Sequence, residues 1–133
     1  MPYYRLFYHF VWATHERLPL ITPEVAPHLY RAIRVKVEGL QGLTHAINAM
    51  PDHLHLVVTV PPKLALATFI GQVKGNASHL AARLPGVEAF AWQNEYGVLS
   101  VSERHLPVVV RYVQNQAQHH ADNKLNARFE LSA

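Results

Sequence analysis

The sequence predicts an α+β protein in which helices pack on a single antiparallel β-sheet. Three observations predict this class. Residues 3–14 and 53–60 alternate in polarity and are rich in β-branched and aromatic residues, as strands are. The turn-forming residues 50–52 precede the second of these stretches and predict a hairpin. Residues 64–84 instead repeat apolar side chains at helical spacing.

The first strand is expected over residues 3–14, and a helix follows it. Thr22 can cap the N-terminus of that helix, because its hydroxyl accepts a hydrogen bond from a backbone N–H of the first turn. Pro23 then occupies the first helical position, where no N–H is needed. We expect this helix to continue to Glu38 and to stop at Gly39.

The hairpin is expected to join strands over residues 42–49 and 53–60. A second helix over residues 64–84 and a fourth strand over 96–102 follow. The last element is a helix from Leu106 to about residue 123, with a proline in its first turn.

The order β-α-β-β-α-β, followed by an added helix, matches the ferredoxin-like split βαβ arrangement. In that arrangement the first and third strands lie at the centre of the sheet, and two helices cover one of its faces. The added C-terminal helix would then have to cross the open face.

Composition limits the class of protein further. The 133 residues, half of them apolar, are enough for one core, so we expect a single domain over residues 1–133. The chain has no cysteine, which excludes disulfides and zinc–thiolate sites. It shows neither a signal peptide nor an apolar run of membrane-spanning length, so we expect a cytoplasmic protein that does not associate with membranes. The formal charge of +3 permits a polyanionic partner without requiring one.

His53 and His55 form the most informative pattern in the chain. Residues two apart in a strand share a face, and two neutral imidazoles side by side can hold one divalent metal ion. Burying two imidazoles on one face is costly unless something compensates, which favours a site. The same spacing also arises by chance, and a strand can carry exposed histidines, so the pair alone leaves both interpretations open.

Tyr112 and Gln116 provide a second constellation. They are four residues apart in the predicted last helix, which places both on one helical face. Leu54 and Leu56 point away from the histidines, so the pair should lie on the open face that this helix crosses. A metal-binding pair on a strand, with a tyrosine and an amide on a helix, are the parts of a metal-assisted nucleophile.

Six segments carry a resemblance to a known family, and they agree with it in order and spacing as well as in residue type. They are Tyr8-His9-Phe10-Val11-Trp12-Ala13-Thr14, Met50-Pro51-Asp52-His53-Leu54-His55, Gln72-Val73-Lys74-Gly75, Ala91-Trp92-Gln93, Tyr96-Gly97-Val98-Leu99-Ser100-Val101, and Tyr112 with Gln116. In these segments the chain resembles the single-tyrosine HUH transposases of the insertion-sequence 200/605 group, over nearly its whole length.

The resemblance implies that His53, His55 and Gln116 bind a divalent cation, Mg²⁺ or Mn²⁺, and that Tyr112 is the nucleophile. It implies a transposase that cleaves and rejoins single-stranded DNA at hairpin-bearing element ends through a 5′-phosphotyrosine. It also implies a homodimer, in which the tyrosine helix serves either the histidine site of its own subunit or that of the partner. The residue types suit this chemistry, because a phenol with a pKa of about 10 is a poor nucleophile and needs a polarised phosphate. Imidazole ligands favour Mn²⁺ over Mg²⁺.

Several side chains are candidates for contacts with DNA. Phosphates could be bound by the basic residues Lys74, Arg83, Arg5 and Arg104, and bases could stack on Trp92 and Tyr96. An exposed lysine or arginine is more often simply solvated, and a tryptophan such as Trp92 is more often part of a core. Asp52 either orients one of the histidines or only caps the turn.

Three hypotheses about function follow. The first is the transposase. The second keeps the fold and DNA binding in a domesticated relative, acting as a site-specific single-stranded DNA nickase or a DNA-binding regulator. The third treats the histidine pair as incidental, in a ferredoxin-like dimer that binds a small molecule or a protein. Matching hairpins beside the reading frame would distinguish the first from the second, and metal-dependent DNA cleavage would distinguish the first from the third.

Overall fold

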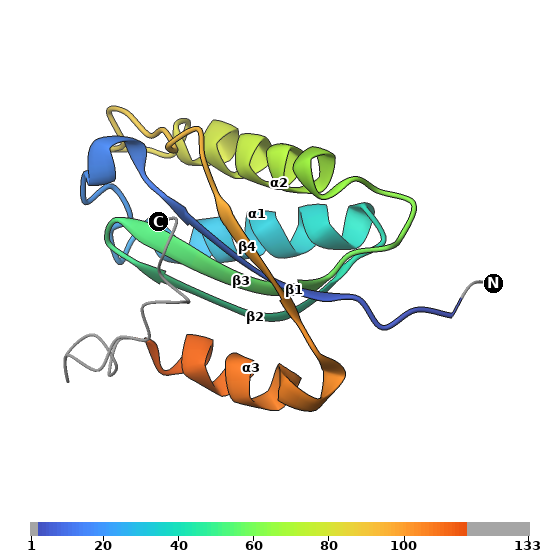
Figure 1. Cartoon of the computed structure of the whole chain (residues 1–133). Coiled ribbons are helices and arrows are strands. Elements are labelled where there is room, and N and C mark those ends of the chain that lie inside the picture. The colour runs from blue at the N-terminus through green and yellow to red at the C-terminus, as the bar shows by residue number, and fades with distance from the viewer. Residues whose placement is uncertain (1–2, 117–133) are drawn as a thin grey trace.

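The computed structural model describes residues 3–116 and confirms the α+β class (Figure 1). A four-stranded antiparallel sheet lies between two helices on one face and one helix on the other. In chain order the elements are β1 (Phe7–Ala13), η1 (His15–Arg17), α1 (Ala26–Gly39), β2 (Leu43–Met50), β3 (His53–Thr59), α2 (Leu66–Ala81), β4 (Gly97–Val101), η2 (Glu103–His105) and α3 (Leu106–Gln114), where η1 and η2 are short 3₁₀ helices.

The strand order is β2-β3-β1-β4, with every neighbouring pair antiparallel. This is the expected ferredoxin-like order, with β1 and β3 at the centre. Val11 pairs with His55 and Ala13 pairs with His53. Since residues opposite each other in an antiparallel pair share a face, alternate residues of β1, His9 among them, lie on the same face as the two histidines.

The main core fills the space between the sheet and the two helices α1 and α2. The sheet contributes Phe10, Trp12, Ile47, Leu54, Leu56 and Val58, α1 contributes Leu29, Ile33 and Val37, and α2 contributes Phe69, Ile70, Val73 and Ala77. Leu54, Leu56 and Val58 of β3 are all in this core, as the alternation predicts. The histidines between them therefore face the other side of the sheet.

A second, smaller core holds α3 against that other side. It comprises Phe7, Ala46, Val57, Val101, Val109, Tyr112 and Val113. Val109, Tyr112 and Val113 are spaced by three and four residues, so they form one stripe along the helix. The expectation that the last helix covers the open face is confirmed. α3 ends at Gln114 with Asn115 as its C-cap, so it is shorter than the expected span to about residue 123, and the expected residues beyond 116 lie outside the described part of the chain.

Two elements, β1 and α1, start three or more residues later than the sequence expectation. β1 begins at Phe7 rather than at residue 3, because both of its partners end there: Phe7 pairs with Thr59 of β3 and with Val101 of β4. α1 begins at Ala26 because a turn precedes it. In that turn the Thr22 hydroxyl accepts a hydrogen bond from the Val25 N–H at 3.2 Å, so the expected capping residue caps the turn.

α2 is shorter than the expected span of residues 64–84. At its end the Arg83 N–H donates to the Leu80 carbonyl at 3.1 Å, and the Leu84 N–H donates to the Ala81 carbonyl at 3.2 Å. These bonds join residues three apart, so the chain tightens into a turn after Ala81 and the α-helix ends.

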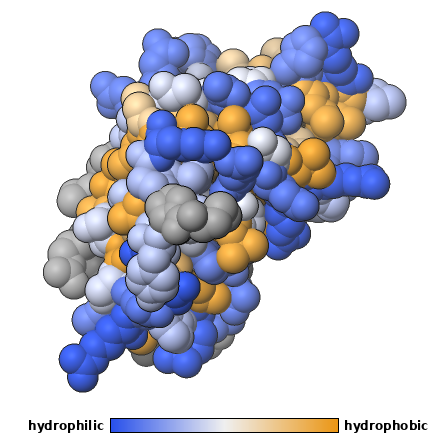
Figure 2. Space-filling model, turned by 90° about the vertical axis from the view of Figure 1, so that its right-hand side faces the viewer, coloured by the Kyte–Doolittle hydropathy of each residue, from blue (hydrophilic) through white to orange (hydrophobic). Residues whose placement is uncertain are grey.

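The surface carries no extended apolar belt on the face that Figure 2 shows, where hydrophobic and hydrophilic residues are interspersed. Exposed large hydrophobic residues such as Val35 and Val108 occur singly along different helices, which is ordinary for a protein surface. Within residues 3–116, no helix combines the length and the hydropathy needed to cross a bilayer.

Candidate metal and nucleophile site

His53 and His55 lie on β3, between the sheet and α3. Only 3% of His53 and 0% of His55 is exposed. The two imidazole centroids are 5.2 Å apart. The prediction that both histidines share one face is therefore confirmed, and the interpretation of the pair as exposed strand residues is wrong.

His53 is held from both sides of its ring. Its Nδ1 lies 2.8 Å from Oδ1 of Asp52, and its Nε2 lies 2.8 Å from Nε2 of Gln116. Because a carboxylate only accepts hydrogen bonds, Nδ1 of His53 carries the proton that is donated to Asp52. The lone pair of the neutral ring is then on Nε2, and the amide of Gln116 donates to it.

Asp52 orients His53, which is one of the two roles that the sequence left open. Its second oxygen, Oδ2, lies 3.4 Å from Nε of Arg17. Burial tends to raise the pKa of Asp52, but the hydrogen bond with His53, the positive charge of Arg17 and the hydrogen bond with Arg17 outweigh it and lower that pKa. At neutral pH the side chain is therefore a carboxylate that holds His53 through one oxygen and Arg17 through the other.

His55 is held by a third histidine that the sequence did not single out. His9 of β1 is fully buried, and its Nε2 lies 2.8 Å from Nδ1 of His55. A hydrogen bond at Nδ1 turns the opposite nitrogen of His55, Nε2, away from β1. Strand alternation and the central places of the first and third strands were the only signals that could have indicated His9.

Tyr112 reaches the histidines from α3, and Gln116 reaches them from just beyond the end of that helix. Gln116 is fully buried and contacts His53 directly, while 9% of Tyr112 is exposed. The rings of Tyr112 and His55 are edge to face, with centroids 6.3 Å apart. The structure therefore brings together the four residues that the sequence proposed, two from β3, one from α3 and one that follows α3.

These donors fit a divalent cation with mixed nitrogen and oxygen ligands. His53 offers the lone pair of Nε2, and a half-turn of the Gln116 amide would place its oxygen where its nitrogen now lies. Among residues 3–116, no three His, Asp or Glu side chains are grouped so as to hold a metal ion. An amide is thus the third donor offered here, and two imidazoles with one amide leave coordination positions for phosphate oxygens.

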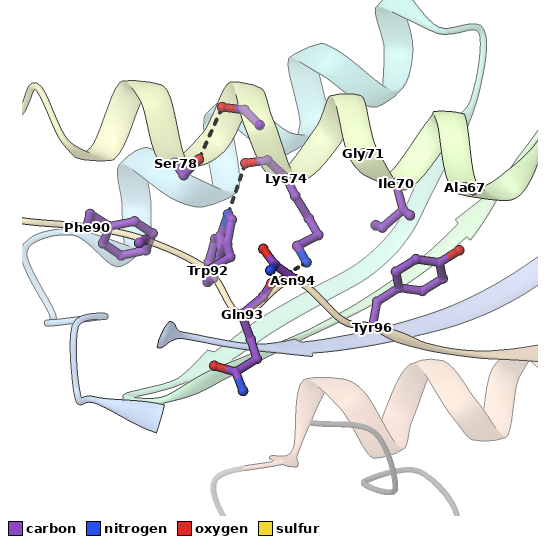
Figure 3. A pocket seen from close by; sticks show the side chains of 12 residues that line it. Ala67, Ile70, Gly71, Lys74, Ser78, Phe90, Trp92, Gln93, Asn94 and Tyr96 are labelled. Atoms are coloured by element: carbon purple, nitrogen blue, oxygen red, sulfur yellow. Dashed lines mark hydrogen bonds between the residues drawn. The ribbon is translucent and has the colours of Figure 1, made fainter. Parts of the chain in front are cut away.

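Lys74, a candidate phosphate contact, lies beside a pocket of about 510 Å³ between α2 and the segment that precedes β4 (Figure 3). Its ammonium donates to the carbonyls of Gln93 at 2.7 Å and Glu95 at 3.1 Å. Burial lowers the pKa of Lys74. In this structure the ammonium therefore fixes the 93–95 segment to α2.

Trp92 lines the same pocket, from the segment that precedes β4, and packs on the main core. Its Nε1 donates to the Lys74 carbonyl at 3.0 Å, and its ring lies edge to face with Trp12, 5.7 Å between centroids, and with Phe90, 4.8 Å between centroids. The packing supports the interpretation of Trp92 as a core residue. Tyr96 is half-buried, and the centroid of its ring lies 6.0 Å from that of Phe10.

The other basic candidates lie at the ends of elements. The guanidinium of Arg5 donates through Nε to Oε2 of Glu103 at 2.9 Å and lies over the ring of Phe7 at 5.1 Å. Arg83 is exposed just after α2, and Arg104 is exposed in η2. Their contacts with phosphates stay predictions.

A sheet that presents two buried histidines to a tyrosine and an amide on one covering helix is the arrangement expected of a single-tyrosine transposase. The sequence matches the family described as "Transposase IS200 like" over residues 2–116, and the chain belongs to this family of insertion-sequence transposases. Membership implies a DNA-cleaving enzyme of DNA transposition. It also argues against the hypothesis of a dimer that binds a small molecule or protein.

Individual relatives agree with this assignment. The chain is 29% identical to the ISDra2 transposase TnpA of Deinococcus radiodurans in an alignment of 121 residues, and the match covers 85% of this chain and 85% of that protein. A crystal structure from Deinococcus radiodurans R1, assigned as a transposase, has a TM-score of 0.67 and 27% identity, and the match covers 87% of this chain and 95% of that one. A REP-associated tyrosine transposase bound to a REP hairpin shares the fold, with a TM-score of 0.66, 19% identity and coverage of 90% and 74%.

Proposed function

We propose that this chain cleaves and rejoins single-stranded DNA at the hairpin-bearing ends of an insertion sequence, with Tyr112 as the nucleophile. In this proposal His53, His55 and Gln116 hold a divalent cation, Mg²⁺ or Mn²⁺. The observation that carries the proposal is the contact between α3 and β3. Gln116 lies 2.8 Å from His53, and Tyr112 faces His55 one helical turn earlier.

The chemistry assigned to Tyr112 is a transesterification. Its phenol oxygen forms a bond to the phosphorus of a DNA phosphodiester and gives its proton to solvent, while the bond from phosphorus to the 3′ oxygen breaks and that oxygen takes up a proton from solvent. The products are a 5′-phosphotyrosine and a free 3′-hydroxyl. Attack by a 3′-hydroxyl on the phosphotyrosine reverses these changes and releases the tyrosine. Because the phosphotyrosine conserves the energy of the bond, rejoining needs no nucleotide cofactor.

The remaining residues of the site orient the two histidines and exclude water. A bound cation would polarise the phosphate and stabilise the charge that develops on its oxygens. Asp52 bonds to Nδ1 of His53, and His9 bonds to Nδ1 of His55. The Nε2 atom of each histidine is therefore the one that would bind the cation. Val109 and Val113 pack on either side of Tyr112 along α3 and keep the helix face at the sheet apolar.

The test is the formation of a covalent protein–DNA adduct. Purified protein is incubated with Mn²⁺ and a labelled single-stranded oligonucleotide that spans the hairpins beside its reading frame, and adducts are separated on a denaturing gel. We expect an adduct from the wild type, none from Tyr112→Phe, and a normal yield from Tyr3→Phe, since Tyr3 is 87% exposed and lies before β1. His53→Ala and His55→Ala should each abolish cleavage and leave much of the hairpin binding. An adduct with Tyr112→Phe, or normal cleavage by either histidine variant, would refute the assignment.

Three further properties belong to the proposal. We propose that the chain is one domain, that it acts as a homodimer and that it works in the cytoplasm. Family membership over residues 2–116 supports the first, because one family unit accounts for most of the chain. Light scattering coupled to size-exclusion chromatography tests the second, and cell fractionation tests the third.

A further inference from the structure

Asn48 of β2 lies next to the site and bonds to the last turn of α3. Its Nδ2 donates to the carbonyl of Val113 at 2.9 Å and to the carbonyl of Gln114 at 3.3 Å. The last carbonyls of a helix have no partner within the helix, so a side-chain amide at this point caps the C-terminus. Asn48 is also paired with His55 across the β2–β3 ladder, which places the cap beside the histidines.

Tyr30 of α1 holds the other end of this amide. Its hydroxyl donates to Oδ1 of Asn48 at 3.2 Å and accepts from the N–H of Ala49 at 3.0 Å. Since β2 is an edge strand, the Ala49 N–H on its outer side has no strand to pair with, and it donates to the hydroxyl of Tyr30 instead. The three groups form one chain of hydrogen bonds from α1, around the edge of the sheet, to α3.

The carbonyls bound by Asn48 belong to the residues between Tyr112 and Gln116. Any change in the position of that turn therefore moves the phenol and the amide together, relative to β3. The smaller core holds α3 by apolar contacts, which are not directional. The hydrogen bonds from Asn48 add directional contacts at the end of α3, beside the contact of Gln116 with His53, and so help to set how far α3 is rotated and advanced over the histidines.

We propose that Asn48 and Tyr30 are positioning residues. They fix the end of α3, which carries Tyr112 and leads directly into Gln116, at the distance from His53 and His55 that the reaction needs. This inference rests on the proposed function. In this proposal Asn48 and Tyr30 act on the reaction only through the position of α3. A nucleophile displaced by about 1 Å can lose a factor of roughly 100 in rate, so weak bonds at this place have large effects.

The experiment compares Asn48→Ala, Tyr30→Phe and the double variant in the full-length protein. Single-turnover cleavage of the hairpin oligonucleotide should slow roughly 10–100-fold in Asn48→Ala, as expected of a misplaced nucleophile. It should slow roughly 2–10-fold in Tyr30→Phe, as expected for one lost hydrogen bond. Because Tyr30 acts through Asn48, the double variant should be no slower than Asn48→Ala alone. Binding of the same oligonucleotide should be unchanged in all three.

Hydrogen exchange gives a readout that needs neither DNA nor metal. In Asn48→Ala the amides of residues 109–116 should exchange faster than in the wild type, while those of α1 and α2 should not change. Matched controls are Asn76→Ala, at an exposed position of α2, and Tyr3→Phe, at the exposed N-terminal segment; both should match the wild type in rate and exchange. All cleavage rates are measured well below the unfolding transition of each variant, so that a loss of global stability does not contribute.

The outcomes separate the two proposals. If the wild type cleaves and Asn48→Ala cleaves at the same rate, or if its α3 amides exchange at wild-type rates, the positioning role is refuted and the proposed function stands. If the wild type forms no adduct through Tyr112, the proposed function is refuted, and with it any role of Asn48 in cleavage. If the double variant is slowed by the product of the two single factors, Asn48 and Tyr30 have independent structural effects, which also contradicts the inference.

Discussion

Replacement of Asp52 should weaken metal binding without removing any proposed ligand. The carboxylate receives the Nδ1 proton of His53 at 2.8 Å and thereby fixes both the rotation of the ring and the nitrogen that bears the lone pair. Asp52→Asn keeps an oxygen at the same place but loses the charge, whereas Asp52→Ala loses both. The two variants therefore separate the electrostatic contribution from the orienting contribution.

The size of the effect follows from the partner that is lost. Removing a group that orients a metal-binding histidine usually lowers metal affinity 10–100-fold, or about 1.4–2.7 kcal/mol. We expect Asp52→Asn near the lower limit, because the hydrogen bond to Nδ1 survives. Asp52→Ala should be near the upper limit, because the imidazole can then turn and its two nitrogens can exchange the proton.

Titration of the purified protein with Mn²⁺, followed by calorimetry or by the spin resonance of free Mn²⁺, measures this affinity without DNA. Arg17→Gln is the matched control, since it removes the other partner of the carboxylate at 3.4 Å and leaves the contact with His53 in place. If Asp52→Ala binds Mn²⁺ as tightly as the wild type does, Asp52 does not act through His53 and the reasoning is wrong.

Two further predictions concern residues away from the histidines. Lys74→Met keeps the aliphatic stem but loses the bonds to Gln93 and Glu95, so the free energy of unfolding in urea should fall by about 1–2 kcal/mol, which exposed Lys63→Met should not reproduce. The salt dependence of DNA binding should be unchanged in Lys74→Met, and a slope smaller by about one would instead indicate a phosphate contact. Burial, with a smaller effect of the positive charge of Arg5, lowers the pKa of His45 below its usual 6.5. The unfolded chain therefore takes up a proton at this residue at a higher pH than the folded chain, and His45 costs stability as the pH falls below about 6.5. His45→Asn should gain stability relative to the wild type between pH 7.5 and pH 5 in urea unfolding, whereas exposed His79→Asn should not; an unchanged difference would contradict the shift.

The order and type of the elements were predictable, because the signals for them are local. Strand alternation and helical spacing are visible within ten or twenty residues, and they determined both the β-α-β-β-α-β order and the place of Pro107 at the start of α3. The residue at which β1 starts was not predictable in this way, because no local signal sets it. Residues 3–6 have strand-like composition, but the sheet begins at Phe7 because Thr59 and Val101 are the last residues available to pair with it.

In the candidate site, too, some features follow from local spacing and others depend on tertiary packing. The common face of His53 and His55 follows from the period of a strand, and the common face of Tyr112 and Gln116 follows from the period of a helix. The first is confirmed, because a regular strand fixes the direction of its own side chains. For the second, α3 ends at Gln114, and Gln116 nevertheless lies on the histidines from just beyond the helix. That Gln116 lies directly on His53 depends on how α3 docks on the sheet, which no spacing within either segment specifies.

By itself the sequence determined which side chains share a face and which residue types are available for metal and phosphate chemistry. Only the tertiary structure decided which residues support them: His9 beside His55, Arg17 beside Asp52, and Asn48 at the end of α3. The physical reason is that these contacts join strands and helices across the sheet, and their geometry is set by strand register and helix docking. A register shift of one residue would turn His9 to the opposite face, although its sequence neighbours would be the same.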